Sequence, residues 1–331
     1  MVELVAILLI AFVLDLFLGD PRYECHPIRL IGQSILKGEQ WLRTSGLHGR
    51  GAGCLLVLAI QALSLACFLF VDMLLHHVFS ILGLLFDLFL CYSFLALGDL
   101  FGHIIPVIRA VEAGRLHEAR GHLAMMVGRD VEALDDAGVC RGGVETLAEN
   151  FVDGFLSPLF YCVAGGILGC VTGLSPLRTA LCFMLVFKIA STMDSMVGYK
   201  RAPYKHLGWG AARLDDILNF VPARLSIMIL FLGALVTRGH ALDGFRVALR
   251  DRLMHDSPNA GHPESFVAGA LHIRLGGPVK YPDGWHKKPW LGAEGKDPGP
   301  TQICSIVEII RSSAWMAMGL SLVILALSPC F

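Results

Sequence analysis

Long apolar runs alternate with polar segments along this chain of 331 residues. Each run approaches the ~20 residues that a helix needs to cross a bilayer. Since lipid cannot hydrogen-bond an open backbone, and no strand-period runs occur, the pattern predicts an all-α fold: a polytopic integral membrane helical bundle. We predict one membrane-embedded domain over residues 1–331. The predicted spans are 2–19, 53–73, 80–105, 154–174, 178–196 and 303–328.

A seventh apolar run, from Asn219 to Thr237, is short for a span. Its uninterrupted part lies between Arg224 and Arg238, and Pro222 would break or start a helix there. Two alternatives to a crossing stay open: the run enters and leaves by one side, or it packs inside the bundle.

Two long polar segments separate the apolar runs. Residues 106–150 have the spacing of amphipathic helices, and 238–302 starts helical and continues as a Gly- and Pro-rich loop. Both are rich in Lys and Arg, as is 20–51, whereas the turns 74–79 and 174–177 have none. The positive-inside rule therefore predicts a multi-pass cell-membrane protein with these basic loops in the cytoplasm and the N-terminus outside. The segment 238–302 lies on the same side as the other basic loops only if the run 219–237 does not cross the membrane, and we adopt that topology.

Composition supports the membrane assignment and narrows the partners. Hydrophobic residues make up 55% and charged residues 17% of the chain, and the mean hydropathy is +0.62. A net charge of −1 gives no basic face, so we expect no nucleic-acid partner. No cysteine pair has CxxC spacing, and cysteines in or beside apolar runs, such as Cys170, are expected to be free, small and buried in a reducing setting.

The densest group of charges next to an apolar run lies in residues 191–224. Lys and Arg there could simply face lipid headgroups. That explanation does not cover Asp194, or the adjacent Asp215 and Asp216, because carboxylates near a bilayer are costly unless they face protein, water, a cation or a ligand. We therefore predict a functional site in this stretch.

A second candidate feature is a row of carboxylates at Glu145, Glu149 and Asp153. Their spacing of four would place all three on one face of a helix, where like charges repel unless a cation neutralises them. Because this face runs into an apolar helix, we predict a divalent-metal or ammonium-binding face. A solvated face, partly compensated by Arg141, is the alternative.

Two polar segments could contact substrate. The loop after residue 250 combines Ser257, Asn259 and Glu264 with glycine and proline, a composition that can cradle anions such as phosphate or simply cap a helix. Near the first span, Asp20 and His26 form a polar group, although a single histidine is more often structural than a ligand.

The chain has no P-loop, dinucleotide fingerprint, HExxH or GxSxG motif.

Taken together, five blocks of the sequence resemble the adenosylcobinamide-phosphate synthase (CbiB) family of cobalamin biosynthesis. They occur in the family's order and span most of the chain, whereas residues 281–302 lie outside the resemblance. Two small departures occur. The family often has Ala-Pro where this chain has Ser157-Pro158, and Trp or a similar residue where this chain has His262. The blocks are DLFLGDPRYECHPIRLIG, ETLAENFVDGFLSPLF, TMDSMVGYK with ARLDDILNFVPARL, HDSPNAGHPESFVAGAL, and RLGG.

The resemblance implies an ATP- and Mg²⁺-dependent acid–amine ligase, in which the cofactors are ATP and Mg²⁺. It would join adenosylcobyric acid to (R)-1-amino-2-propanol or its O-phosphate, giving adenosylcobinamide or its phosphate. Partners would be these substrates, the lipid bilayer and, as candidates, other membrane enzymes of late cobalamin assembly. The alternative is a membrane corrinoid transporter or binding protein without catalysis. A transporter usually shows two related halves and mid-membrane polar residues, and the sequence shows neither.

Amide ligation needs phosphate-binding cations, a metal site and a proton acceptor. Candidate catalytic residues are Asp194, Lys200, Arg213, Asp216 and Arg224. Candidate substrate-binding residues are Asp20, His26, Asn150, Tyr199, Ser257, Asn259 and Glu264. Candidate metal ligands are Glu149, Asp153, Asp215 and Asn219.

The spacing of polar residues within 191–224 suggests individual roles for three of them. Asp215 lies four residues before Asn219, so a continuous helix would offer both oxygens to Mg²⁺. Asp216 would then be free to orient Arg213 or a nearby Lys. Because one amidation needs nucleotide, acid and amine together, we predict that the blocks converge on one pocket facing the cytoplasm.

Overall fold

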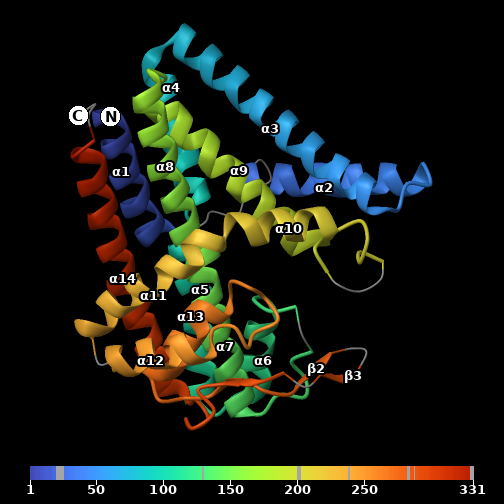
Figure 1. Ribbon diagram of the computed structural model, residues 1–331, viewed down its shortest axis with the longest axis vertical. Coiled ribbons are helices and arrows are strands. Elements are labelled where there is room, and N and C mark those ends of the chain that lie inside the picture. The colour runs from blue at the N-terminus through green and yellow to red at the C-terminus, as the bar shows by residue number, and fades with distance from the viewer. Residues whose placement is uncertain are drawn as a thin grey trace. The chain divides into compact units, whose positions relative to one another are not determined.

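The computed structural model of the chain describes residues 1–19, 26–128, 130–199, 203–237, 239–281, 284–286 and 288–328. Its regular structure is almost entirely helical (Figure 1), which confirms the predicted all-α bundle. Within these residues, five helical segments are long and apolar enough to span a membrane, and they coincide with five predicted spans. They are Arg50–Val78, Ser80–Glu112, Asp136–Thr172, Pro176–Val197 and Pro300–Ala326.

The other two apolar runs are less regular. α1 (Val2–Leu18) is helical as predicted, but it has only 17 residues. α10 (Trp209–Leu218) and α11 (Phe220–Leu235) qualify as a span only as a pair bent by 43°. In an unbroken helix the ring of Pro222 would meet the carbonyl of Leu218. The predicted continuous helix through Asp215 and Asn219 is therefore wrong.

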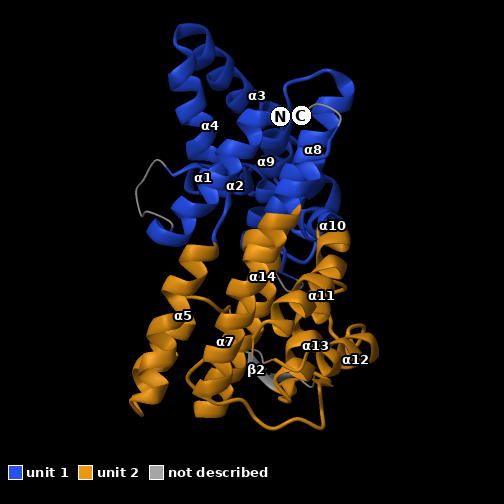
Figure 2. Cartoon of the chain, turned by 90° about the vertical axis from the view of Figure 1, so that its left-hand side faces the viewer, with its two compact units in different colours: residues 1–96, 157–218, 321–331 blue, residues 97–156, 219–320 orange. Residues whose placement is uncertain are grey.

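The chain forms two compact units, coloured separately in Figure 2. Unit 1 comprises residues 1–96, 157–218 and 321–331, and unit 2 comprises 97–156 and 219–320. Unit 1 contains α1, α10, the last residues of α14 (Pro300–Ala326), and α2 (Pro27–Thr44), α3 (Arg50–Val78), α4 (Ser80–Phe94), α8 (Ser157–Thr172) and α9 (Pro176–Val197).

Unit 2 contains α11, most of α14 and the helices of the first polar segment. Its other helices are α5 (Leu97–Glu112), α6 (Leu116–Ala124), α7 (Asp136–Phe151), the π-helical turn η1 (Val152–Leu156), α12 (Ala241–Asp251) and α13 (Gly261–Ala270). The segment 106–150 is therefore largely helical, as its spacing predicts.

In unit 1, α8 packs along α9, and α10 lies against α3 and α9. The start of α9 is set by Ser175, whose hydroxyl accepts a hydrogen bond from the backbone N–H of Arg178, and by Pro176 in the first turn. At the other end, a Cβ on Gly208 would lie 1.7 Å from the carbonyl oxygen of Val197. Only glycine fits there, so the approach to α10 is held against the end of α9.

Unit 2 is built around the antiparallel pair α12–α13, with α11 against both, while α5 packs on α6 and α7. Four short strands follow α13: β1 (Leu275–Gly276) pairs with β4 (Trp290–Leu291), and β2 (Val279–Tyr281) pairs with β3 (Gly284–His286). Strands of two or three residues are too short to show an alternating pattern. The predicted Gly- and Pro-rich loop therefore contains pairings that its sequence does not reveal.

Trp290 ties this strand-containing segment to the helices of unit 2. Its ring lies 4.7 Å from the guanidinium carbons of both Arg141 and Arg274. Both arginines also bond the carboxylate of Asp297, at 2.5 Å from Arg141 and 2.6 Å from Arg274. Hydrogen bonding by Arg274, reinforced by Arg141, lowers the pKa of Asp297 to about 2. The segment is thus held by charge as well as by backbone pairing.

The cysteines in or beside the apolar runs were expected to be free. This expectation is wrong at Cys170, near the end of α8, which is disulfide-bonded. Other cysteines in the described ranges, including Cys91 and Cys162, are free thiols. The sequence gives no spacing rule that would single out Cys170.

Four charged or polar side chains join α3, α4 and α9 within unit 1. Asp72 and Asp87 are buried, with 1% and 2% of their surface exposed. Arg178 Nε lies 2.5 Å from Asp72 Oδ2, and His76 Nε2 lies 2.9 Å from Asp87 Oδ2 and 3.5 Å from Asp72 Oδ1. Two buried carboxylates are thereby matched by one guanidinium and one imidazole, which stabilises them in an apolar setting.

Replacing Arg178 by Met should lower the free energy of unfolding by about 3 kcal/mol, because it leaves a buried carboxylate without its cation. Thermal unfolding of the purified protein in detergent measures this change. Arg115→Met is the matched control, since the Arg115–Glu118 pair is exposed and should cost less than about 1 kcal/mol. Equal effects of the two substitutions would contradict the stabilising role of the buried group.

Candidate functional site

Each of the two units carries part of the predicted site. Unit 1 contains His26, Asp194, Tyr199, Arg213, Asp215 and Asp216. Unit 2 contains Glu149, Asn150, Asp153, Asn219, Arg224, Ser257, Asn259 and Glu264. Asp20 and Lys200 lie outside the described residues. Convergence of all the blocks on one pocket stays a prediction, and the geometry within each unit is as follows.

In unit 1, the predicted residues lie at the end of α9 and along α10. Asp194 occupies the last turn of α9 and is half-buried. On α10, Arg213 Nη1 lies 3.5 Å from Asp216 Oδ2, which is one of the two pairings predicted for Asp216. Asp215 is half-buried beside it. The group therefore offers carboxylates and one guanidinium within two adjacent helices.

The end of α10 is held by Tyr161, whose hydroxyl donates a hydrogen bond of 2.9 Å to the carbonyl of Leu218. This bond satisfies one of the carbonyls that every helix leaves open at its C-terminus. The aromatic side chain of α8 thereby fixes the helix that carries Asp215 and Asp216.

Two other predicted residues of unit 1 have different environments. His26 is buried, and its Nδ1 accepts a hydrogen bond of 3.3 Å from the N–H of Ile28, which caps α2 ahead of Pro27. This contact supports the structural explanation of His26. Tyr199 is 42% exposed, and its ring centre lies 5.9 Å from that of Tyr204. It remains accessible to a ligand.

The carboxylate row of unit 2 differs from the prediction. Glu145 is buried, and its Oε1 accepts a hydrogen bond of 2.7 Å from the N–H of Gly276. This contact gives Glu145 a structural role. The α-helix ends at Phe151, and Asp153 lies in the π-helical turn that follows, so the three carboxylates do not share one regular α-helical face. Glu149 is exposed and Asp153 half-buried, and π-turns are frequent at functional sites.

A second group of unit 2 lies where α11 meets the loop before α13. Arg224 donates from Nη1 to the carbonyl of Phe220 at 2.6 Å and to Asn259 Oδ1 at 3.4 Å. A predicted catalytic residue and a predicted substrate-binding residue, 35 positions apart, are thus in contact. Ser257 Oγ accepts from the N–H groups of Asn259 and Ala260, both at 3.2 Å. Its hydroxyl therefore shapes the turn, in agreement with the capping alternative.

Two histidines beside this group were missed as candidates in the sequence: His255 in the loop and His262 at the start of α13. His255 Nδ1 accepts a hydrogen bond of 3.0 Å from the N–H of Ser257, and its Nε2 lies 3.9 Å from buried Glu264. His262 is 1% exposed. Burial, followed by the charge of Arg224, lowers the pKa of His262 to about 4, and burial also lowers the pKa of His255. The only sequence signal was the pair of histidines bracketing the Ser-Pro-Asn turn.

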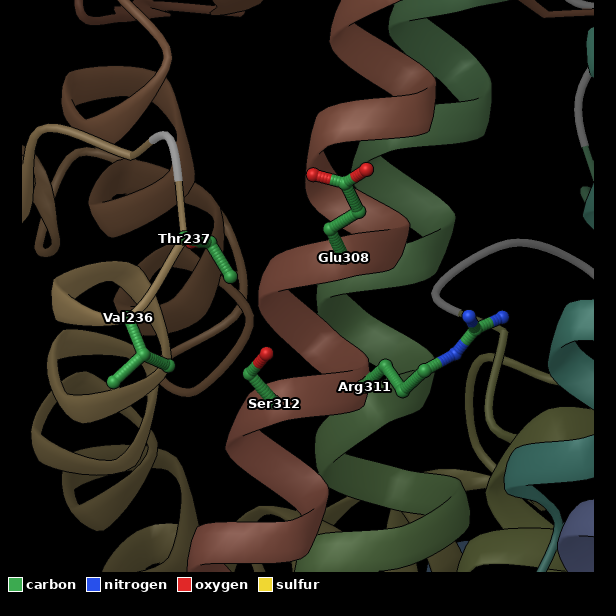
Figure 3. Close-up of a pocket in the computed structure, with 5 residues that line it drawn as sticks. All are labelled: Val236, Thr237, Glu308, Arg311 and Ser312. Carbon is green, nitrogen blue, oxygen red and sulfur yellow. The ribbon is translucent and has the colours of Figure 1, made fainter.

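A cavity of about 480 Å³ lies elsewhere in unit 2. Figure 3 shows Ser312 and Glu308 of α14 near Val236 and Thr237, with Arg311 directed to the other side of α14. Since the cavity contains none of the predicted site residues, we do not assign the substrate to it.

Comparison with known proteins identifies the family. The model of the family described as CobD/Cbib protein matches residues 8–310. A cobalamin biosynthesis protein CobD from Klebsiella pneumoniae is 37% identical over 316 residues, covering 95% of this chain and 93% of that protein. This chain belongs to the CobD/CbiB family. The resemblance noted in the sequence is thereby confirmed.

Other members of the CobD/CbiB family agree over similar lengths. The cobalamin biosynthesis protein CobD of Clostridium perfringens is 34% identical over 318 residues, which is 96% of each chain. That of Pelobacter propionicus is 40% identical over 278 residues, which is 83% of this chain and 81% of its own. No solved structure matches the chain. Family membership gives the chain a role in cobalamin biosynthesis.

The residues of this family member suit a magnesium ion in their donor chemistry. Mg²⁺ prefers oxygen ligands and few protein contacts. Asp215 in unit 1 is a half-buried carboxylate, and Glu149 and Asp153 in unit 2 are carboxylates beside an apolar helix. Asn219 is buried at the break before α11. Oxygen donors suited to a hard cation are therefore present in both units.

The lowered pKa of His262 predicts a pH-dependent stability. Unfolded histidine takes up a proton below pH ~6.5, whereas folded His262 stays neutral down to about pH 4. Acidification through this window therefore favours unfolding, and stability is kept above it. Between pH 7 and pH 5 we expect a loss of about 2 kcal/mol from this residue.

Thermal unfolding in detergent across that pH range tests the assignment. His262→Gln should flatten the pH dependence, and His255 should supply what remains. His117→Gln, at an exposed position, is the control and should keep the wild-type profile. An unchanged profile in His262→Gln would show that His262 is not the group responsible.

Proposed function

We propose that the protein is an ATP- and Mg²⁺-dependent ligase of cobalamin biosynthesis. It joins the side-chain carboxylate of adenosylcobyric acid to (R)-1-amino-2-propanol or its O-phosphate, which gives adenosylcobinamide or adenosylcobinamide phosphate. The observation that carries the proposal is family membership over nearly the whole length of this chain and its relatives. The charged groups of the two units supply the chemistry such a ligase needs.

A carboxylate does not react with an amine at neutral pH unless it is activated. In the proposed reaction the γ-phosphoryl group of ATP passes to the carboxylate, forming an acyl phosphate and ADP. The neutral amine then attacks the acyl carbon, the C–N bond forms as the C–O bond to phosphate breaks, and the amine proton passes to a base. Bound Mg²⁺ supplies charge neutralisation on the nucleotide phosphates.

The α9–α10 group is suited to the phosphoryl-transfer half of this reaction. Arg213, oriented by Asp216 at 3.5 Å, would stabilise charge on the transferring phosphoryl group. Asp215 would hold the magnesium ion, and Asp194 would accept the amine proton. Lys200, which comes after α9 in the sequence, is a second candidate cation for the phosphoryl group.

The unit 2 group is suited to substrate binding. Arg224, in contact with Asn259, presents a guanidinium that can bind a phosphate or carboxylate. Glu149 and Asp153 could hold Mg²⁺ together with the nucleotide, and Asn150 and Glu264 offer hydrogen bonds to substrate. The hydrogen bond from the N–H of Gly276 to Glu145 holds β1 against α7, the helix that carries Glu149 and Asn150.

We place the protein in the cell membrane with the active site on the cytoplasmic side. The basic loops favour that orientation. The disulfide at Cys170 near the end of α8 supports it, because disulfides persist in oxidising compartments. α9 then returns across the membrane and carries Asp194 to the opposite side. The bilayer is thus a partner, and other membrane enzymes of late cobalamin assembly remain candidates.

Asp215→Asn should lower the rate of amide formation at least about 100-fold at limiting Mg²⁺, since it removes a proposed ligand of the metal that neutralises the phosphates. Excess Mg²⁺ should recover part of the activity. The assay incubates purified protein with ATP, Mg²⁺, adenosylcobyric acid and aminopropanol phosphate, or aminopropanol, and detects the amide by mass spectrometry.

The matched control is Asp136→Asn, an exposed carboxylate in the first turn of α7, which should leave the rate unchanged. Near-normal turnover by Asp215→Asn would remove Asp215 from the site and move the metal assignment to Glu149 and Asp153. If the wild-type protein forms no amide but carries corrinoid across liposome membranes, the ligase proposal fails in favour of a transporter.

A further inference from the structure

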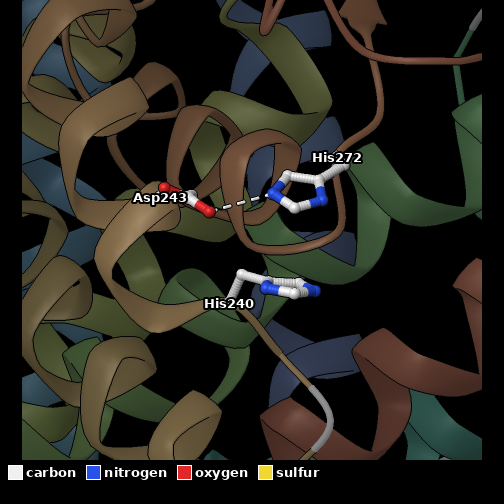
Figure 4. A group of neighbouring side chains, drawn as sticks. All are labelled: His240, Asp243 and His272. Atoms are coloured by element: carbon white, nitrogen blue, oxygen red, sulfur yellow. Dashed lines mark hydrogen bonds and ion pairs between the residues drawn. The ribbon is translucent and has the colours of Figure 1, made fainter.

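A cluster of two histidines and one aspartate lies on unit 2, away from the residues assigned above. His240 precedes α12, Asp243 lies in its first turn, and His272 follows α13 by two residues (Figure 4). His272 Nε2 is 3.0 Å from Asp243 Oδ2, and the two imidazole rings stack with their centres 4.3 Å apart. One ligand atom from each residue lies within 4.8 Å of the others.

The backbone holds these three residues in place before any ligand binds. The N–H of His240 donates to the carbonyl of Ala270 at 2.9 Å. A Cβ on Gly269 would lie 2.5 Å from the carbonyl oxygen of Asp243, so α12 and α13 are in direct backbone contact. His272 itself has φ of +51°, a conformation that costs a non-glycine residue about 1 kcal/mol or more.

A neighbouring arginine holds the carboxylate of the cluster in place. Asp243 stays ionised because hydrogen bonds from His272 and Arg246 lower its pKa. Arg246 Nη1 bonds Asp243 Oδ1 at 3.0 Å, which orients the carboxylate and leaves Oδ2 toward the histidines. Supporting contacts of this kind are usual around metal-binding carboxylates.

The donor set determines which cation would bind. One carboxylate oxygen with two imidazole nitrogens suits Zn²⁺, Co²⁺ and related first-row ions, whereas Mg²⁺ and Ca²⁺ prefer oxygen alone. The other described group of this kind, Asp72, His76 and Asp87, has a single histidine, and its charge is already balanced by Arg178. It fits a transition metal less well.

We propose that His240, Asp243 and His272 form a binding site for a divalent transition-metal ion, with the remaining coordination positions taken by water. The ring of His240 is exposed, so it can rotate about its side-chain bonds to direct a nitrogen lone pair toward the ion. The ion replaces the hydrogen bond between His272 and Asp243. This site does not depend on the proposed ligase activity.

Titration of the untagged, full-length protein in detergent with Co²⁺ tests the proposal, because the visible absorption of Co²⁺ reports nitrogen ligands and low coordination number. We expect one Co²⁺ per chain at this site, displaced by Zn²⁺. Loss of a residue that only supports a ligand weakens metal binding by about 10- to 100-fold. Loss of a ligand itself should therefore weaken Co²⁺ binding by about 100-fold or more. The ligand variants are His240→Ala and His272→Asn, since asparagine also tolerates positive φ.

Two further variants separate coordination from folding. Arg246→Gln should weaken binding about 10-fold through the orientation of Asp243. His117→Ala, an exposed histidine of α6, should bind as wild type. Circular dichroism confirms that each variant is folded, and amide formation should be unchanged in all of them. Co²⁺ binding with equal affinity by wild type and by the His240→Ala, His272→Asn double variant, or the absence of binding by wild type, would overturn the proposal.

Discussion

The cost of a charge beside hydrocarbon governs where this protein can keep its reactive groups. Between the apolar helices α3 and α9, the buried carboxylate of Asp72 is matched by Arg178 at 2.5 Å. Elsewhere they collect at helix ends and in loops: Asp194 in the last turn of α9, Asp215 on the helix that follows. The proposed reaction of phosphates and a carboxylate needs such an arrangement, because its chemistry must occur where water and ions can reach.

The part of the fold that follows from local properties could be predicted from the sequence. Spans follow from hydropathy, since each residue's transfer cost is nearly independent of its neighbours. The short strands around Trp290 depend on contacts between distant residues. The break at Asn219 has a local cause in Pro222, but the sequence could not show whether the helix would bend or end there.

The same distinction applies to the candidate site. The Arg213–Asp216 pair follows from a spacing of three on a helix. The Arg224–Asn259 contact joins residues 35 positions apart, and no spacing rule indicates that these two side chains meet. Burial of His262 and the capture of Glu145 by Gly276 are tertiary effects. Spacing alone could not show that Glu145 accepts a hydrogen bond from the N–H of Gly276.

The central claim is that ATP drives amide formation by phosphorylating the corrinoid carboxylate. An isotope experiment tests it most directly: the wild-type protein is given adenosylcobyric acid carrying ¹⁸O in the reacting carboxylate, with ATP, Mg²⁺ and aminopropanol phosphate. The account predicts that one ¹⁸O per turnover appears in inorganic phosphate, in step with ADP and the amide. Label appearing in AMP, or amide forming without consumption of ATP, would contradict it.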